Sequence, residues 1–67
     1  MAQVTLNGKK ENLNCPLLVS EFLLSKKIDP DRVVVEINRA IIQKEEYHTR
    51  KISPGDTIEL ISFVGGG

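Results

Sequence analysis

The residues with the clearest chemical potential are three consecutive glycines, Gly65, Gly66 and Gly67, at the end of the sequence. At glycine's average usage of roughly 7%, a run of three is expected by chance about three times in ten thousand at any given position. Because glycine has no Cβ, these residues can enter a slot too narrow for any other side chain. They would present the carboxylate of Gly67, which is ionised at neutral pH and becomes a good electrophile only when its oxygen is converted into a leaving group.

Other residues that could do chemistry are poorly placed for it. His48 is the single histidine and has no cysteine or carboxylate at a recognisable ligand spacing, so no metal site is predicted. Glu45 and Glu46 are adjacent, and neighbouring residues on a helical turn project in different directions, which disfavours an acid/base pair. Cys15 is expected to be a partly buried structural thiol, with a redox or transfer role as the alternative. No catalytic residue is predicted.

Length and composition favour a small carrier or binding module over an enzyme. A chain of 67 residues forms one domain with a small core and little room for a catalytic pocket. Lysine plus arginine and aspartate plus glutamate balance at nine each, which disfavours general nucleic-acid binding. With one cysteine, no secretory signal and no apolar stretch of about 20 residues, we expect a cytoplasmic protein that does not enter membranes. We also expect the free protein to be a monomer.

The first elements are a β-hairpin and a helix. Residues 3–6 alternate apolar and polar side chains, and Asn7-Gly8 is a typical two-residue hairpin turn into a second strand at residues 11–14.

The helix follows Pro16 and is amphipathic. Val19, Phe22 and Leu23 have the three-to-four residue spacing of an apolar helix face. Residues 28–31 are expected to close the helix, because Pro30 disfavours helical geometry at the residue before it.

The second half of the sequence reads mostly as strands. Residues 33–37 are β-branched with one apolar face and make the best central strand. A very short strand is expected at residues 41–42, a charged helical turn at 43–47, a tight turn at 53–56 and the last strand at 57–63.

The predicted order, β-β-α-β-β-β, corresponds to an α+β fold. A lone amphipathic helix must bury its apolar face, and it can do so across one face of a mixed sheet. The first and last strands are expected to pair in parallel at the centre of that sheet. The predicted domain covers residues 1–64, with residues 65–67 as a tail that is flexible in the free protein.

The last strand carries a second clue. Its alternation places Ile58 and Leu60 on the face toward the helix and leaves Ile61 and Phe63 toward solvent. An apolar surface at Ile61, Phe63 and Val64, beside the glycines, is expected to dock a partner protein. The alternative is that Phe63 folds back over the edge of the sheet.

These features together resemble the sulfur-carrier proteins of thiamine biosynthesis, the ThiS family. The resemblance covers essentially the whole chain and is carried by its length, the order of elements, the Asn7-Gly8 turn, the Pro54-Gly55-Asp56 turn and the final Phe63-Val64-Gly65-Gly66-Gly67.

The resemblance implies a β-grasp, ubiquitin-like fold and a non-catalytic role as sulfur donor. It implies that a ubiquitin-activating-like adenylyltransferase uses ATP to adenylate the carboxylate of Gly67, and that a sulfur-donating enzyme then supplies the sulfur of a thiocarboxylate. Thiazole synthase would use this thiocarboxylate to form thiazole. Gly65 and Gly66 would present the tail, and the carrier itself would bind no cofactor and no metal.

Three alternatives stay open at this point. The small subunit of molybdopterin synthase shares the fold and the diglycine. A ubiquitin-like modifier would form isopeptide bonds through the same terminus, and a β-grasp interaction module would never activate it.

The chain departs from the family pattern at two places. Asn38-Arg39 stands where Asn-Gly is common, and arginine is less comfortable than glycine at positive φ, so another form of turn is expected. Leu17 stands near the usual serine or threonine cap, so the start of the helix is expected to be loose or shifted.

Overall fold

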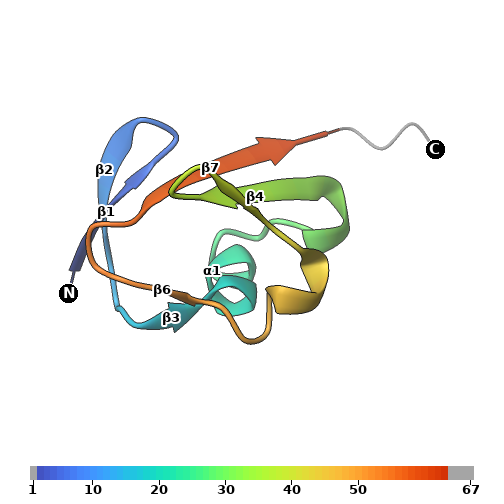
Figure 1. Ribbon diagram of the computed structural model, residues 1–67, viewed down its shortest axis with the longest axis horizontal. Helices are drawn as coiled ribbons and strands as arrows, with labels where there is room; N and C mark the ends of the chain where they lie inside the picture. Colours follow the sequence, from blue (N-terminus) through green and yellow to red (C-terminus); the bar gives the residue numbers. More distant parts are fainter. Residues whose placement is uncertain (1, 64–67) are drawn as a thin grey trace.

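The computed structural model describes residues 2–63, which form a five-stranded mixed sheet with one helix across it (Figure 1). The strand order in this sheet is β2-β1-β7-β4-β5, and a separate two-stranded sheet pairs β3 with β6. In chain order the elements are β1 (Ala2–Leu6), β2 (Lys9–Leu13), β3 (Leu17–Leu18), α1 (Val19–Ser25), η1 (Pro30–Arg32), β4 (Val33–Ile37), β5 (Ala40–Ile42), η2 (Lys44–Glu46), β6 (Lys51–Ile52) and β7 (Thr57–Ser62).

The opening hairpin forms as predicted. Asn7 and Gly8 have φ angles of 48° and 83°, the positive values that a type I′ turn requires at both central positions. This turn sets the register in which Leu6 faces Lys9. The side chain of Asn7 also accepts a hydrogen bond from the backbone N–H of Leu60 at 2.8 Å, so the turn is attached to β7.

The middle of the sheet is the parallel pair predicted for the first and last strands. In this pair Thr5 lies opposite Thr57 and Leu6 opposite Ile58. The strand predicted to be central, β4, is interior, but the middle position belongs to β7, which lies between β1 and β4. β7 therefore has a paired strand on each side at its start, and its last residues pair with β4, so the segment that leads to the glycines follows an interior strand of the sheet.

The helix covers one face of the sheet with its predicted apolar side. Val19, Phe22 and Leu23 are 0–1% exposed, and Val35 and Ile58 meet them from the sheet at similarly low exposure. The remaining core residues are Val4, Val33, Ile37, Ile42, Tyr47 and Ile52.

The end of the helix differs from the prediction. The helix stops at Ser25, well before Pro30, in a turn through Lys27, whose φ is 58°. The backbone N–H of Ile28 donates to the carbonyl of Leu23 at 2.9 Å, and that of Lys27 donates to Leu24 at 3.0 Å, which is the Schellman pattern. Proline therefore does not close α1, and Pro30 instead begins η1.

The start of the helix is fixed by contacts that the sequence did not reveal. Leu18 rather than Leu17 is the N-cap, and its backbone N–H donates to the carboxylate of Glu21 at 2.9 Å. The next two N–H groups, of Val19 and Ser20, donate to backbone carbonyls of the segment 47–50 at 3.0 and 2.8 Å. These N–H groups have no partner within a helix, so the neighbouring segment takes the place of a side-chain cap.

The two-stranded sheet of β3 and β6 was not predicted. It pairs Leu17 with Ile52 and Leu18 with Lys51, on the side of α1 away from β7 in Figure 1. It attaches the long connection between β5 and β7 to the start of the helix.

The turn between β4 and β5 corrects a prediction. Asn38 and Arg39 have φ angles of 52° and 69°, so both central positions keep positive φ although the second is arginine. The side chain of Asn38 donates to a carboxylate oxygen of Asp56 at 3.0 Å and accepts from the backbone N–H of Thr57 at 2.9 Å. The expectation of another form of turn is therefore wrong: both central residues have the positive φ of an Asn-Gly hairpin turn. Hydrogen bonds from Asn38 to the neighbouring turn support this conformation.

Candidate functional site

The last strand divides its side chains between the core and solvent as predicted. Ile58 is fully buried and Leu60 half-buried on the helix side, whereas Ile61 is 55% and Phe63 50% exposed on the other side. Phe63 follows the end of β7, and its backbone N–H donates to the carbonyl of Arg32 at 3.1 Å. Phe63 therefore continues the line of β7 and keeps half of its surface exposed. Its role in docking stays a prediction.

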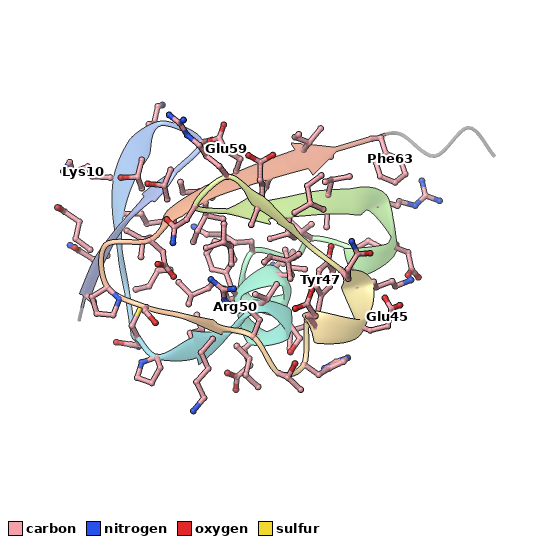
Figure 2. The ribbon with its side chains drawn as sticks, in the orientation of Figure 1. Lys10, Glu45, Tyr47, Arg50, Glu59 and Phe63 are labelled. Carbon is pink, nitrogen blue, oxygen red and sulfur yellow. The ribbon has the colours of Figure 1, made fainter. Side chains whose placement is uncertain are left out.

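Further apolar side chains lie beside this pair on the outer face of the sheet. Val34 is opposite Ile61 in the antiparallel pair of β4 and β7, and Ile41 on the edge strand β5 is 61% exposed. Side chains at alternate positions share a face, so all four lie on the side of the sheet away from α1. We call Val34, Ile41, Ile61 and Phe63 the outer patch. Figure 2 shows Phe63 at the end of β7.

The predicted reactive residue Gly67, the tail residues before it and the docking residue Val64 follow Phe63 in the sequence. Val64, Gly65, Gly66 and Gly67 are outside the described residues, and so are the predictions of a flexible tail and of a domain boundary after residue 64. Of the predicted docking residues, the structure describes Ile61 and Phe63, which belong to the outer patch.

The other titratable candidates have ordinary structural surroundings. His48 and Glu45 are exposed, and Glu46 accepts a hydrogen bond from the backbone N–H of Gln43 at 3.0 Å, which caps η2. Cys15 is a half-buried free thiol packed against the core, as expected for a structural cysteine. Within residues 2–63 there is no cluster of three side chains suited to a metal ion.

Sequence reasoning missed the structural role of Tyr47. Its side chain is 4% exposed, and its hydroxyl donates to the carbonyl of Val33 at 3.4 Å. Burial raises the pKa of the Tyr47 phenol above its usual 10.0. Tyr47 stands at the end of a charged segment with no apolar periodicity, so the pattern gave no sign of its burial.

A groove of about 370 Å³ lies on the side of the helix, away from the outer patch. Its lining is mainly apolar, with Leu24 as its most exposed large apolar side chain at 78%. The lining residues are Ser20, Glu21, Leu23, Leu24, Ile28, Pro30, Lys44, Tyr47 and His48. Across the described part of the chain, no helix has both the length and the apolar character to cross a bilayer.

Comparison with known proteins gives the family. The family model of the ThiS family matches residues 2–67, which is nearly the whole chain and includes the glycines. The chain belongs to the ThiS family. The α+β, ubiquitin-like fold predicted from the sequence is confirmed by a crystal structure of the thiamine biosynthesis protein ThiS from Geobacter metallireducens. That structure superposes with a TM-score of 0.83 at 31% identity, over 97% of this chain and 99% of the other.

Two curated relatives add functional context to this ThiS-family chain. The sulfur carrier protein ThiS of Bacillus subtilis is 41% identical over 49 residues, which cover 73% of this chain and 74% of the relative. A thiazole synthase of Paramagnetospirillum magneticum is 31% identical over 65 residues, or 97% of this chain. The chain spans only 20% of the length of that thiazole synthase, so the similarity concerns one part of the larger protein.

Proposed function

We propose that this chain is a sulfur carrier of thiamine biosynthesis, with the carboxylate of Gly67 as the group that carries sulfur. The observation that carries this proposal is the match of the ThiS family model over residues 2–67, because this single match covers both the folded domain and the three glycines. The similarity to a Bacillus subtilis sulfur carrier supports the same activity. Both favour the thiamine pathway over the molybdopterin pathway.

The proposed chemistry takes place on the Gly67 carboxyl group in two steps. A carboxylate oxygen attacks the α-phosphorus of ATP and pyrophosphate leaves, which gives an acyl adenylate with AMP as a good leaving group. A sulfur nucleophile supplied by a sulfur-donating enzyme then attacks the carbonyl carbon. AMP departs, which leaves an acyl disulfide when the nucleophile is the terminal sulfur of a persulfide on the donor. A thiol then attacks the donor's own sulfur atom, the S–S bond breaks as a disulfide forms between that thiol and the donor, and the thiocarboxylate is released. The ATP is bound by the activating partner, and the carrier is a co-substrate rather than a catalyst.

The geometry of β7 suits delivery of the terminus into a partner. The six residues from Ser62 to Gly67 can extend about 20 Å at the limit of chain length per residue. In this proposal the outer patch and Val64 rest on the partner surface, and the small size of Gly65 and Gly66 lets the terminus enter a narrow channel.

The proposed partners follow from the chemistry. A ubiquitin-activating-like adenylyltransferase forms the acyl adenylate, and thiazole synthase takes up the sulfur. The second partner is supported by proteins named thiazole synthase in Paramagnetospirillum magneticum and Magnetococcus marinus, each of which contains a region similar to 97% of this chain. We propose that these reactions take place in the cytoplasm and that the free carrier is a monomer.

A gene deletion in the organism of origin tests this proposal. The deletion strain should grow only when thiamine or its thiazole moiety is supplied, and a plasmid with the wild-type gene should remove that requirement. A plasmid whose product lacks Gly66 and Gly67 should not remove it. Growth of the deletion strain without thiamine, in the absence of a second carrier gene, would contradict the proposed function.

A further inference from the structure

Two glutamates face each other on the outer face of the sheet. Glu36 on β4 lies directly opposite Glu59 on β7 in the antiparallel register. Directly opposed residues in such a pair have Cβ atoms about 4.5–5.5 Å apart, and like charges at that spacing destabilise the sheet. The ion pairs formed within residues 2–63 involve Glu11, Asp29 and Asp31, and none of them includes Glu36 or Glu59.

The glutamate pair lies beside the outer patch on the same face of the sheet. Ile41 is opposite Glu36 on one side, and the Val34–Ile61 pair is the next row on this face along β4 and β7 toward Phe63. Of the large hydrophobic side chains exposed in the described chain, Ile41, Ile61 and Phe63 lie on this face, and only Leu24 lies elsewhere. The two carboxylates therefore share a face with three of the four large hydrophobic side chains exposed within residues 2–63, in a region that a docked partner would remove from water.

Burial of this face without a cation would be costly. Removal of two neighbouring carboxylates from water needs an opposite charge and hydrogen-bond donors to replace hydration. A guanidinium suits the position better than an ammonium, because its planar fork offers five donors to two carboxylates and it is more weakly hydrated. A second copy of this chain does not fit, because a two-fold face-to-face contact would bring two such pairs together.

We propose that the partner that docks on the outer patch places an arginine between Glu36 and Glu59, with Ile41 and Ile61 packed against the apolar part of that arginine. This inference rests on the proposed function and assigns the arginine to the adenylyltransferase. It gives the two glutamates a role in recognition that opposes their effect on folding, since their mutual repulsion is relieved only in the complex.

Removal of either glutamate charge should therefore stabilise the free domain and weaken the complex, and both effects can be measured. Glu36→Gln and Glu59→Gln remove one charge each at nearly constant size, so each should raise the urea midpoint of the free domain. Each should also weaken binding of the purified adenylyltransferase by about 30-fold or more, because one partner of a desolvated charge pair is lost. The decrease of affinity with increasing salt should become shallower in both variants.

Glu45→Gln is the matched control. Glu45 is an exposed glutamate on η2, well away from Glu59 in Figure 2. Glu45→Gln should leave the dissociation constant of the complex with the adenylyltransferase unchanged, and the change of that constant with salt should also stay the same. Both are measured by isothermal titration calorimetry at two salt concentrations. Unchanged affinity of the Glu36 and Glu59 variants would overturn the inference. A fall of both affinity and urea midpoint would overturn it too, because it would indicate a structural role.

The outcomes also separate this inference from the proposed function. If the adenylyltransferase adenylates the wild type and both variants and binds all three with equal dissociation constants, the carrier function stands and the arginine contact is wrong. If the adenylyltransferase neither binds nor adenylates the wild-type chain, the proposed function and the contact are both wrong.

Discussion

Truncation of Phe63 to alanine should weaken docking without removing the reactive terminus. A phenylalanine buries roughly 150–250 Å² when it is fully covered. Because Phe63 is 50% exposed in the free chain, about 100 Å² remain to be covered by a partner. At about 25 cal/mol per Å², this area corresponds to about 2.5 kcal/mol, or about 60-fold in affinity.

The assay is steady-state adenylation with the purified adenylyltransferase, read as pyrophosphate release over a range of carrier concentrations. Phe63 contacts the partner equally before and during the reaction, so Phe63→Ala should raise KM about 60-fold and leave kcat nearly unchanged. Leu24→Ala is the control, because Leu24 is 78% exposed on α1, away from the outer patch. An unchanged KM for a folded Phe63→Ala protein, or an equal rise for Leu24→Ala, would refute docking through the outer patch.

Two further predictions concern the fold. Arg39→Gly should raise the free energy of unfolding by about 1 kcal/mol, since arginine at a φ of 69° carries a steric cost that glycine lacks; a lower urea midpoint would contradict this. Burial raises the pKa of the Tyr47 phenol above 10.0, so as pH rises the unfolded chain loses the phenolic proton before the folded chain does. The stability that the protonated phenol contributes is therefore lost as pH rises above about 10 and through the raised pKa of the folded state. The free energy of unfolding of Tyr47→Phe should therefore fall less than that of the wild type over this pH range, measured by urea titration followed by circular dichroism. An equal fall with pH in both proteins would contradict the raised pKa of Tyr47.

Local signals in the sequence were sufficient for most of the main sheet and for the helix. Asn7-Gly8 fixes its turn through backbone φ alone, and the spacing of Val19, Phe22 and Leu23 defines a helix face that the structure buries at 0–1% exposure. Alternation in β7 also placed Ile61 and Phe63 correctly on the exposed face. In each case the residue type or period decides the outcome within a few positions of the chain.

The parts that were missed depend on contacts between distant segments. The strands β3 and β6 have two residues each, too few for a period, and they form because Leu17 meets Ile52 across the start of α1. The helix ends through Lys27 at a φ of 58°, a position that glycine would have marked in the sequence. Arg39 keeps positive φ because the hydrogen bonds of Asn38 to the neighbouring turn outweigh the local preference.

The docking surface was predictable only in part. The alternation of β7 gave Ile61 and Phe63, whereas Ile41 and the pair formed by Glu36 and Glu59 emerged only once the register of β4 with its neighbours was known. A shift of one residue in that register would have turned these side chains to the other face.

The central claim is that sulfur is carried on the carboxyl group of Gly67, and intact-protein mass spectrometry tests it most directly. After incubation with ATP, the adenylyltransferase and a sulfur source, the chain should gain about 16 Da, the difference when one oxygen is replaced by sulfur in an acyl transfer of this kind. Fragmentation should place that gain on Gly67, and omission of ATP should abolish it. No gain in mass, a gain located on Cys15, or covalent attachment of the chain to other proteins would contradict the account.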